Sequence, residues 1–154
     1  MIQRIQSLFL LVAATCGILM FFTPVATYSG VSGTFTLDML GIHYSADNET
    51  RMMILPLSLN VIASLLPLTT LFMFKRRRRQ MKLCRLTMLV FSGLVAVIFL
   101  SPEAVIKDLY NGSAFETHYQ PGVGLPLLAL VCVFLATVFI KKDEKLVRSA
   151  DRLR

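Results

Sequence analysis

Residues 123–140, VGLPLLALVCVFLATVFI, form a long apolar run that contains no charged side chain. An α-helix needs roughly 20 apolar residues to cross the hydrocarbon core of a bilayer. Three further apolar runs lie at about residues 5–26, 52–74 and 86–106. Backbone amides in lipid must find partners within their own segment, so each of the four runs predicts a transmembrane helix.

The composition of the whole chain agrees with this prediction. Hydrophobic residues make up 55% of the 154 residues and charged residues 16%, whereas soluble domains average about 45–50% and about 25%. A soluble fold of this length could not bury so much apolar surface, but a bilayer acts as an apolar solvent for it. We therefore expect one all-α membrane domain, residues 1–154, with four transmembrane helices.

The basic residues are strongly segregated along the chain. The connection at residues 75–85 and the tail at residues 141–154, together with Arg4, hold fourteen of the 16 Lys and Arg residues and three acids. The remaining connections hold two basic and six acidic residues, so the two sides carry net charges of +11 and −4. Lys and Arg accumulate in cytoplasmic loops. We therefore expect both termini, the loop at 75–85 and the tail in the cytoplasm.

The connections on the other side have weaker patterns. Residues Gly33–Asp38 alternate polar and apolar side chains, which suggests a short strand or half of a hairpin closed near Gly41. Residues 104–110 have apolar side chains three to four apart, which predicts an interfacial helical turn. We expect a small irregular or hairpin-like first outer loop on an otherwise helical protein.

The tail at residues 141–154 has no Gly or Pro, so the fourth helix is expected to extend into the cytoplasm. Leu146, Ala150 and Leu153 follow one another at helical spacing and share one face. Such a stripe would pack on a partner or on the protein's own basic loop, or it would lie on the membrane surface. The sequence does not choose between these alternatives.

The candidate residues for binding a partner or a lipid come from the basic loop and the tail. The loop lacks the interleaved aromatic side chains that binders of single-stranded nucleic acid use for stacking. A basic run of this kind holds a loop inside the cell, attracts anionic head groups at about 1 kcal/mol per residue, or docks a protein or RNA. The candidates are Lys75, Arg76, Arg77, Arg78, Arg79, Lys82, Arg85, Leu146, Arg148, Ala150, Arg152, Leu153 and Arg154.

No catalytic, cofactor-binding or metal-binding pattern is visible. Single histidines, His43 and His118, lie in the outer connections. Asn60 is the most notable polar side chain within the apolar runs, and we expect it to serve helix packing. Asn60, Ser64 and Thr137 are the candidates for a transport path. However, no Asp, Glu, Lys or Arg occurs within the cores of the runs, residues 5–26, 52–74, 86–100 and 123–140, which argues against a proton-coupled carrier.

The two ends of the chain carry a resemblance. Residues 1–7, MIQRIQS, and residues 142–154, KDEKLVRSADRLR, together look like a family of small uncharacterised four-helix inner-membrane proteins of the Bacteroidetes. The resemblance implies a bacterial inner membrane and a periplasmic outer face, and it implies no activity.

The sequence thus favours a non-enzymatic accessory or scaffold subunit of an inner-membrane complex, which docks through its basic loop and tail and needs no cofactor. The alternatives are a small transporter or channel component, and docking of ribosomes, RNA or anionic lipids by the basic face. The expected partners are membrane lipids with anionic head groups and one or more proteins of the same membrane.

Overall fold

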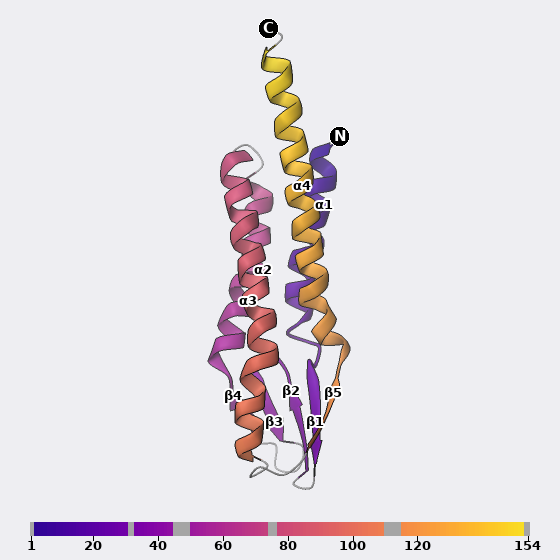
Figure 1. Cartoon of the computed structure of the whole chain (residues 1–154), viewed down its shortest axis with the longest axis vertical. Helices are drawn as coiled ribbons and strands as arrows, with labels where there is room; N and C mark the ends of the chain where they lie inside the picture. Colours follow the sequence, from indigo (N-terminus) through magenta and orange to yellow (C-terminus); the bar gives the residue numbers. More distant parts are fainter. Residues whose placement is uncertain (1, 31–32, 45–49, 74–76, 110–114, 153–154) are drawn as a thin grey trace.

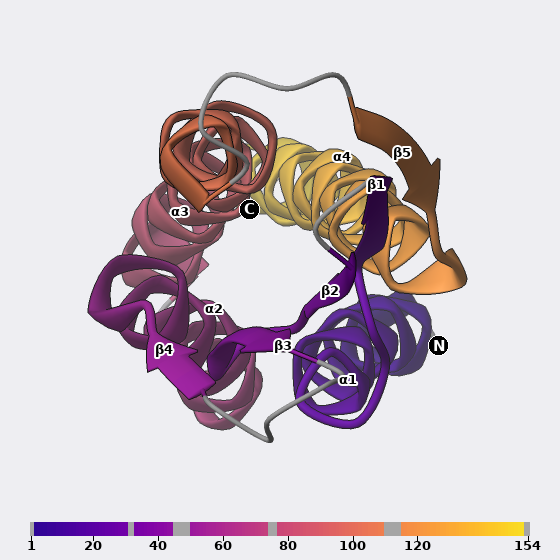
Figure 2. The same cartoon turned by 90° about the horizontal axis from the view of Figure 1, so that it is seen from below.

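Four helices form the body of the protein. The computed structural model describes residues 2–30, 33–44, 50–73, 77–109 and 115–152. Each helix packs against two neighbours, so that the order around the bundle is α1, α2, α3, α4 and back to α1 (Figures 1 and 2). The helices are α1 (Ile2–Leu19), α2 (Ile54–Phe72), α3 (Arg77–Leu109) and α4 (Gly124–Arg152).

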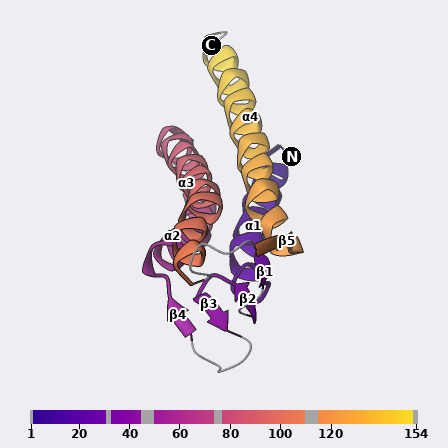
Figure 3. The same cartoon turned by 60° about the horizontal axis from the view of Figure 1, so that its bottom comes forward.

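A five-stranded antiparallel sheet lies at one end of the bundle (Figures 1 and 3). Its strand order is β4-β3-β2-β1-β5, so a strand from the connection between α3 and α4 completes a sheet built from the connection between α1 and α2. A short 3-10 helix, Pro121–Val123, leads from β5 into α4. The strands are β1 (Ala26–Gly30), β2 (Gly33–Leu37), β3 (Gly41–Tyr44), β4 (Thr50–Met52) and β5 (Phe115–Tyr119).

The predicted all-α fold class is therefore wrong. The expected strand near residues 33–38 is β2, but it is one of five strands and not half of an isolated hairpin. An isolated two-stranded hairpin is marginal in water, whereas three or more strands with an apolar face can be stable. The decisive pairing is between β1 and β5, because it joins two connections that are far apart in the sequence.

The two faces of the sheet differ in polarity. Tyr28, Phe35 and Leu37 are buried on one face, while the alternate positions in β1 and β2 carry hydroxyl side chains. Strand side chains point to opposite faces in turn, which gives an apolar face for packing and a polar face for solvent. One polar row crosses all five strands and consists of His118, Thr27, Thr36, His43 and Thr50.

The turn between β2 and β3 requires glycine at one position. Gly41 has a φ of 155°, and a Cβ atom there would lie 2.1 Å from the carbonyl oxygen of Arg51. The Asp38 carboxylate accepts hydrogen bonds from the backbone N–H groups of Leu40 and Gly41, at 2.8 and 2.9 Å. These bonds fix the turn, since an aspartate side chain competes well for nearby backbone donors.

The helix bounds differ from the predicted spans. The helix α1 ends at Leu19 instead of reaching residue 26, because Ala26 already belongs to β1. Residue 52 belongs to β4, and α2 begins two residues later. The helix α3 runs beyond both predicted ends, so residues 104–109, where a separate interfacial turn was expected, continue it. The helix α4 continues without a break through the tail to Arg152.

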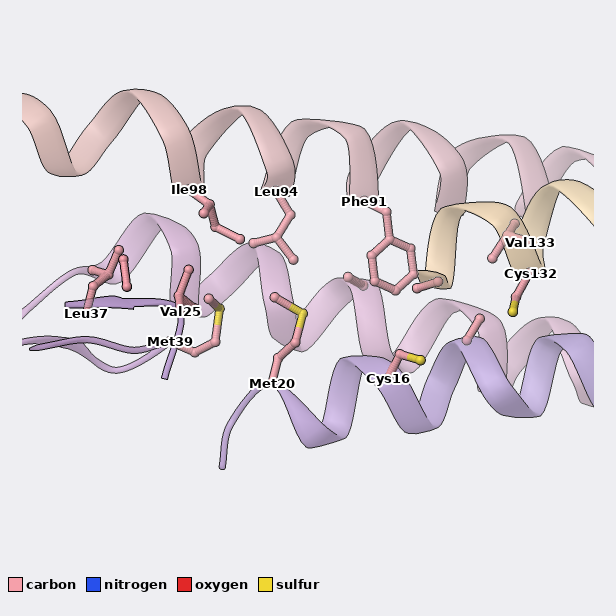
Figure 4. Packing of buried hydrophobic residues seen from close by; sticks show 14 of the residues in the cluster. Cys16, Met20, Val25, Leu37, Met39, Phe91, Leu94, Ile98, Cys132 and Val133 are labelled. Atoms are coloured by element: carbon pink, nitrogen blue, oxygen red, sulfur yellow. The ribbon is translucent and has the colours of Figure 1, made fainter. Parts of the chain in front are cut away.

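A single hydrophobic core joins the sheet to the bundle. Figure 4 shows Leu94 and Ile98 of α3 pointing toward Val25, Leu37 and Met39 at the sheet end. The same core continues between the helices through Phe91, Met20, Cys16, Cys132 and Val133. Because the sheet shares its core with the helices, it is an integral part of the fold.

Candidate functional site

The outside of the helices is apolar, while several polar side chains lie inside the bundle. Asn60 of α2 is fully buried, as are Thr70 and Thr87. This arrangement is opposite to that of a soluble bundle. Large apolar side chains are exposed on every helix, for example Leu8, Leu11, Leu55, Leu65, Leu89, Leu100, Val131 and Phe134.

Three helical segments are long and apolar enough to cross a membrane. They are Ile54–Phe72, Arg79–Leu100 and Pro121–Leu146, and the remaining apolar helix, Ile5–Leu19, is shorter. Among the described residues, three of the four predicted spans are therefore matched by helices with the length and composition that a crossing requires. The first helix is shorter because the chain leaves it at Leu19 to enter the sheet.

Asn60 supplies a hydrogen bond to the end of α1. Its Nδ2 donates to the carbonyl oxygen of Gly17, at 3.2 Å. The last four carbonyls of a helix lack partners within the helix. The other three at this end accept bonds from the backbone N–H groups of Met20, Phe21 and Phe22. Asn60 therefore satisfies the one carbonyl of the last turn of α1 that following backbone N–H groups leave open.

The helices α1 and α2 approach closely at the same place. A Cβ atom on Gly17 would lie 2.9 Å from Cβ and 3.1 Å from Cα of Ser64. Small residues allow this approach, which is a common way for membrane helices to pack. The Asn60 side chain reaches the Gly17 carbonyl only because the two backbones are so near.

The candidates for a transport path have local partners. The hydroxyl of Ser64 donates to the carbonyl of Val61, and that of Thr137 donates to the carbonyl of Val133. Only the Oδ1 atom of Asn60 and the Nε2 atom of Gln6 are buried without a hydrogen-bond partner in the described part of the chain. The polar groups thus serve mainly their own helices, and no observation on them favours transport.

The predicted binding residues that the structure describes lie at the end of the bundle opposite to the sheet, where α1 and α3 begin and α2 and α4 end (Figure 1). Arg79, Lys82 and Arg85 are exposed on α3, and Leu146 on α4 is 51% exposed. Arg77 and Arg78 fall within α3, and Arg148, Ala150 and Arg152 fall within α4. Lys75, Arg76, Leu153 and Arg154 lie outside the described residues.

Three lysines that sequence reasoning did not list also belong to this end. Lys141, Lys142 and Lys145 are exposed on α4. Sequence reasoning placed them in the tail but singled out only its apolar stripe and its arginines. The helical spacing of these lysines was the available signal. We call Arg79, Lys82, Arg85, Lys141, Lys142 and Lys145 the basic end.

Sequence reasoning missed a hydrogen-bonded chain on the sheet. Nε2 of His43 lies 2.8 Å from Oδ2 of Asp38, and its Nδ1 lies 2.9 Å from the hydroxyl of Thr50. These bonds tie β4 to the turn that Asp38 holds. The other outer histidine, His118, lies on β5, which is separated from β3 by two strands, so the two histidines do not share a site.

Comparison with known proteins adds a family assignment. No curated protein matches the chain. The match of a family model covers nearly the whole chain, residues 2–153, which agrees with the expectation of an uncharacterised family. The chain belongs to the family described as "Domain of unknown function (DUF4293)".

Proposed function

We propose that this protein is a non-enzymatic accessory or scaffold subunit of a bacterial inner-membrane complex. In this proposal the helices lie in the bilayer, the basic end faces the cytoplasm and the sheet faces the periplasm. A protein partner docks on the basic end.

The distribution of apolar and charged side chains supports the membrane placement. The apolar exterior of all four helices suits lipid, in which no hydrogen-bonding groups are available. The basic side carries a net charge of +11 and the sheet side −4. The positive-inside rule then favours the basic end in the cytoplasm.

One observation carries the docking proposal: α4 is a single helix that extends past the ends of α1 and α3 (Figure 1). Its 29 residues have a length of about 43 Å, whereas the hydrocarbon core measures about 30 Å. The helix continues roughly along the bundle axis, so its last turns project away from the bilayer. This direction favours contact of the tail with a protein partner over contact with the membrane surface.

Most of the stability of a helix comes from packing of its apolar face. The last turns of α4 lie beyond the bundle, and Leu146 is half-exposed there beside Lys145. A partner that covers the exposed half of Leu146 would add packing to these turns. The lysines around it would favour an acidic surface on that partner.

Site-specific photocrosslinking in cells tests this proposal. A photoreactive residue at position 145, on the basic end, is expected to give an adduct of one defined mass with another protein. The matched control places the same residue at position 131, which is exposed on the apolar part of α4. There we expect no protein adduct.

A second variant tests the contact itself. Leu146→Glu is expected to abolish the adduct from position 145, because it puts a charge into the proposed contact. A chain that gives no adduct at position 145, or an adduct unaffected by Leu146→Glu, would contradict the docking proposal. Circular dichroism of the purified variant checks that the helices are retained.

A further inference from the structure

A stripe of basic side chains runs down the outer side of α3 into a zone where the neighbouring helices are apolar. Arg79, Lys82 and Arg85 are all exposed and follow one another three residues apart, so they share one face of the helix. The same face then turns apolar, since Leu86 is 46% and Leu89 69% exposed. Arg85 therefore lies at the inner limit of the stripe.

The register between α3 and α4 gives the depth of Arg85. The side chains of Cys84 and Thr137 lie close to each other. Arg85 is therefore at the depth of the residues next to Thr137. Along α4, this depth is about 6 Å closer to the sheet than Lys141. The exposed side chains of α4 around this level are Phe134 and Val138.

The other neighbour, α2, is apolar at this level as well. The helices α2 and α3 are antiparallel neighbours joined by a short connection. Arg85, which is eight residues from the start of α3, is therefore at about the same depth as Leu65 of α2. Leu65 is exposed. Arg85 thus lies between apolar surfaces on both sides.

The described part of the protein does not neutralise the charge of the stripe. Within the described residues, no acidic side chain forms an ion pair with Arg79, Lys82 or Arg85. The described acids of this end, Asp143 and Glu144, lie beyond Lys141 along α4. An unpaired cation at the edge of the hydrocarbon zone is costly, so a partner of opposite charge is favoured there.

We propose that the stripe Arg79–Lys82–Arg85 binds the phosphate of an anionic phospholipid from the cytoplasmic leaflet. A lipid suits this position because its phosphate lies at the membrane interface while its acyl chains cover Leu86 and Leu89. Arginine binds phosphate through two parallel N–H donors, and basic sites on the cytoplasmic side of membrane helices bind lipid head groups. This inference rests on the membrane placement proposed above, but not on the docking of a protein.

The absence of tryptophan from the chain permits a clean test. A Leu89→Trp variant puts one fluorophore a turn below Arg85. Its quenching is measured in bilayers that contain dibrominated phosphatidylglycerol or dibrominated phosphatidylcholine. The control is Phe134→Trp, at nearly the same depth on α4. At position 89 we expect stronger quenching by the phosphatidylglycerol than by the phosphatidylcholine. At position 134 we expect the ratio of quenching by the two lipids to be near one.

The arginine is then replaced in the Leu89→Trp background. Arg85→Gln is expected to lower the selectivity about fivefold, the effect of one basic residue near the surface, while Arg85→Lys retains most of it. Lys145→Gln, on the tail of α4, is the matched control and is expected to leave it unchanged.

Equal quenching by the two lipids at position 89, or selectivity that survives Arg85→Gln, would overturn the lipid site and leave the docking proposal intact. If neither tryptophan is quenched by either lipid, the membrane placement itself is wrong, and the lipid site with it.

Discussion

The close approach of α1 and α2 gives the most direct test of the bundle packing. In Gly17→Ala, the new methyl carbon would lie 2.9 Å from Cβ and 3.1 Å from Cα of Ser64. Carbon atoms pack best at about 3.5–4.0 Å, so the two helices must separate by several tenths of an ångström. Neither atom of Ser64 can avoid the contact by rotating a side chain, because both are fixed by the backbone.

Two terms set the size of the effect. Forcing an extra carbon into a packed core costs about 1–3 kcal/mol. The separation also lengthens the bond from Asn60 to the Gly17 carbonyl, which is already 3.2 Å long, and losing it costs about 1 kcal/mol. Alanine itself favours the helix over glycine by about 1 kcal/mol, and this gain opposes the loss.

A second glycine isolates the packing term. Gly93 lies in α3, and a Cβ atom there would have no neighbour within 4 Å. Gly93→Ala therefore carries the helix gain without the clash. We expect the free energy of unfolding of Gly17→Ala to be about 2–4 kcal/mol lower than that of Gly93→Ala. Reversible unfolding in mixed micelles, followed by circular dichroism, measures this difference, and equal stability of the two variants would refute the close packing.

The remaining predictions concern a helix end and a turn. Asn60→Ala leaves the Gly17 carbonyl without its donor and is expected to lower stability in the same micelle assay by about 1–3 kcal/mol. The exposed Ser58→Ala, which removes only a bond within α2, should have little effect, and similar losses for the two would exclude the role of Asn60. Gly41→Ala puts a carbon 2.1 Å from a carbonyl oxygen and is expected to expose the sheet end to proteolysis, whereas Gly124→Ala, with open space around it, should remain resistant. Equal protease resistance of the two glycine variants would contradict the turn geometry.

The helices were predictable because their signal is local. Residues 123–140 are continuously apolar, and the packing of such a run hardly depends on what its neighbours are. The tail was predictable for a similar reason, since it contains no residue that breaks a helix.

The sheet was not predictable because its signal is distributed. Its strands have only three to five residues, and β5 becomes a strand by pairing with β1, about 90 residues away, with Ala26 opposite Tyr119. In the sequence, Phe115–Tyr119 comes after a segment with a helical pattern. Phe115–Tyr119 itself shows no long alternation of polar and apolar side chains. The sheet also decides where α1 ends, so the predicted end of the first span was too late.

The candidate site was predictable in part. Charge segregation located the basic side, but only the structure relates residues on different helices. The depth of Arg85 follows from the Cys84–Thr137 contact, and the role of Asn60 follows from the position of the last turn of α1. Neither relation leaves a spacing pattern in the sequence.

The proposed placement requires that the sheet and the basic end lie on opposite sides of the inner membrane, which thiol labelling measures. In a background without the three native cysteines, Thr34→Cys places a thiol on the exposed face of the sheet and Lys145→Cys places one on the basic end. Intact cells with a permeabilised outer membrane are treated with a membrane-impermeant maleimide. We expect labelling of Thr34→Cys in these cells, and labelling of Lys145→Cys only after the inner membrane is opened. Labelling of Lys145→Cys in intact cells, or equal labelling of both thiols, would contradict the proposed placement.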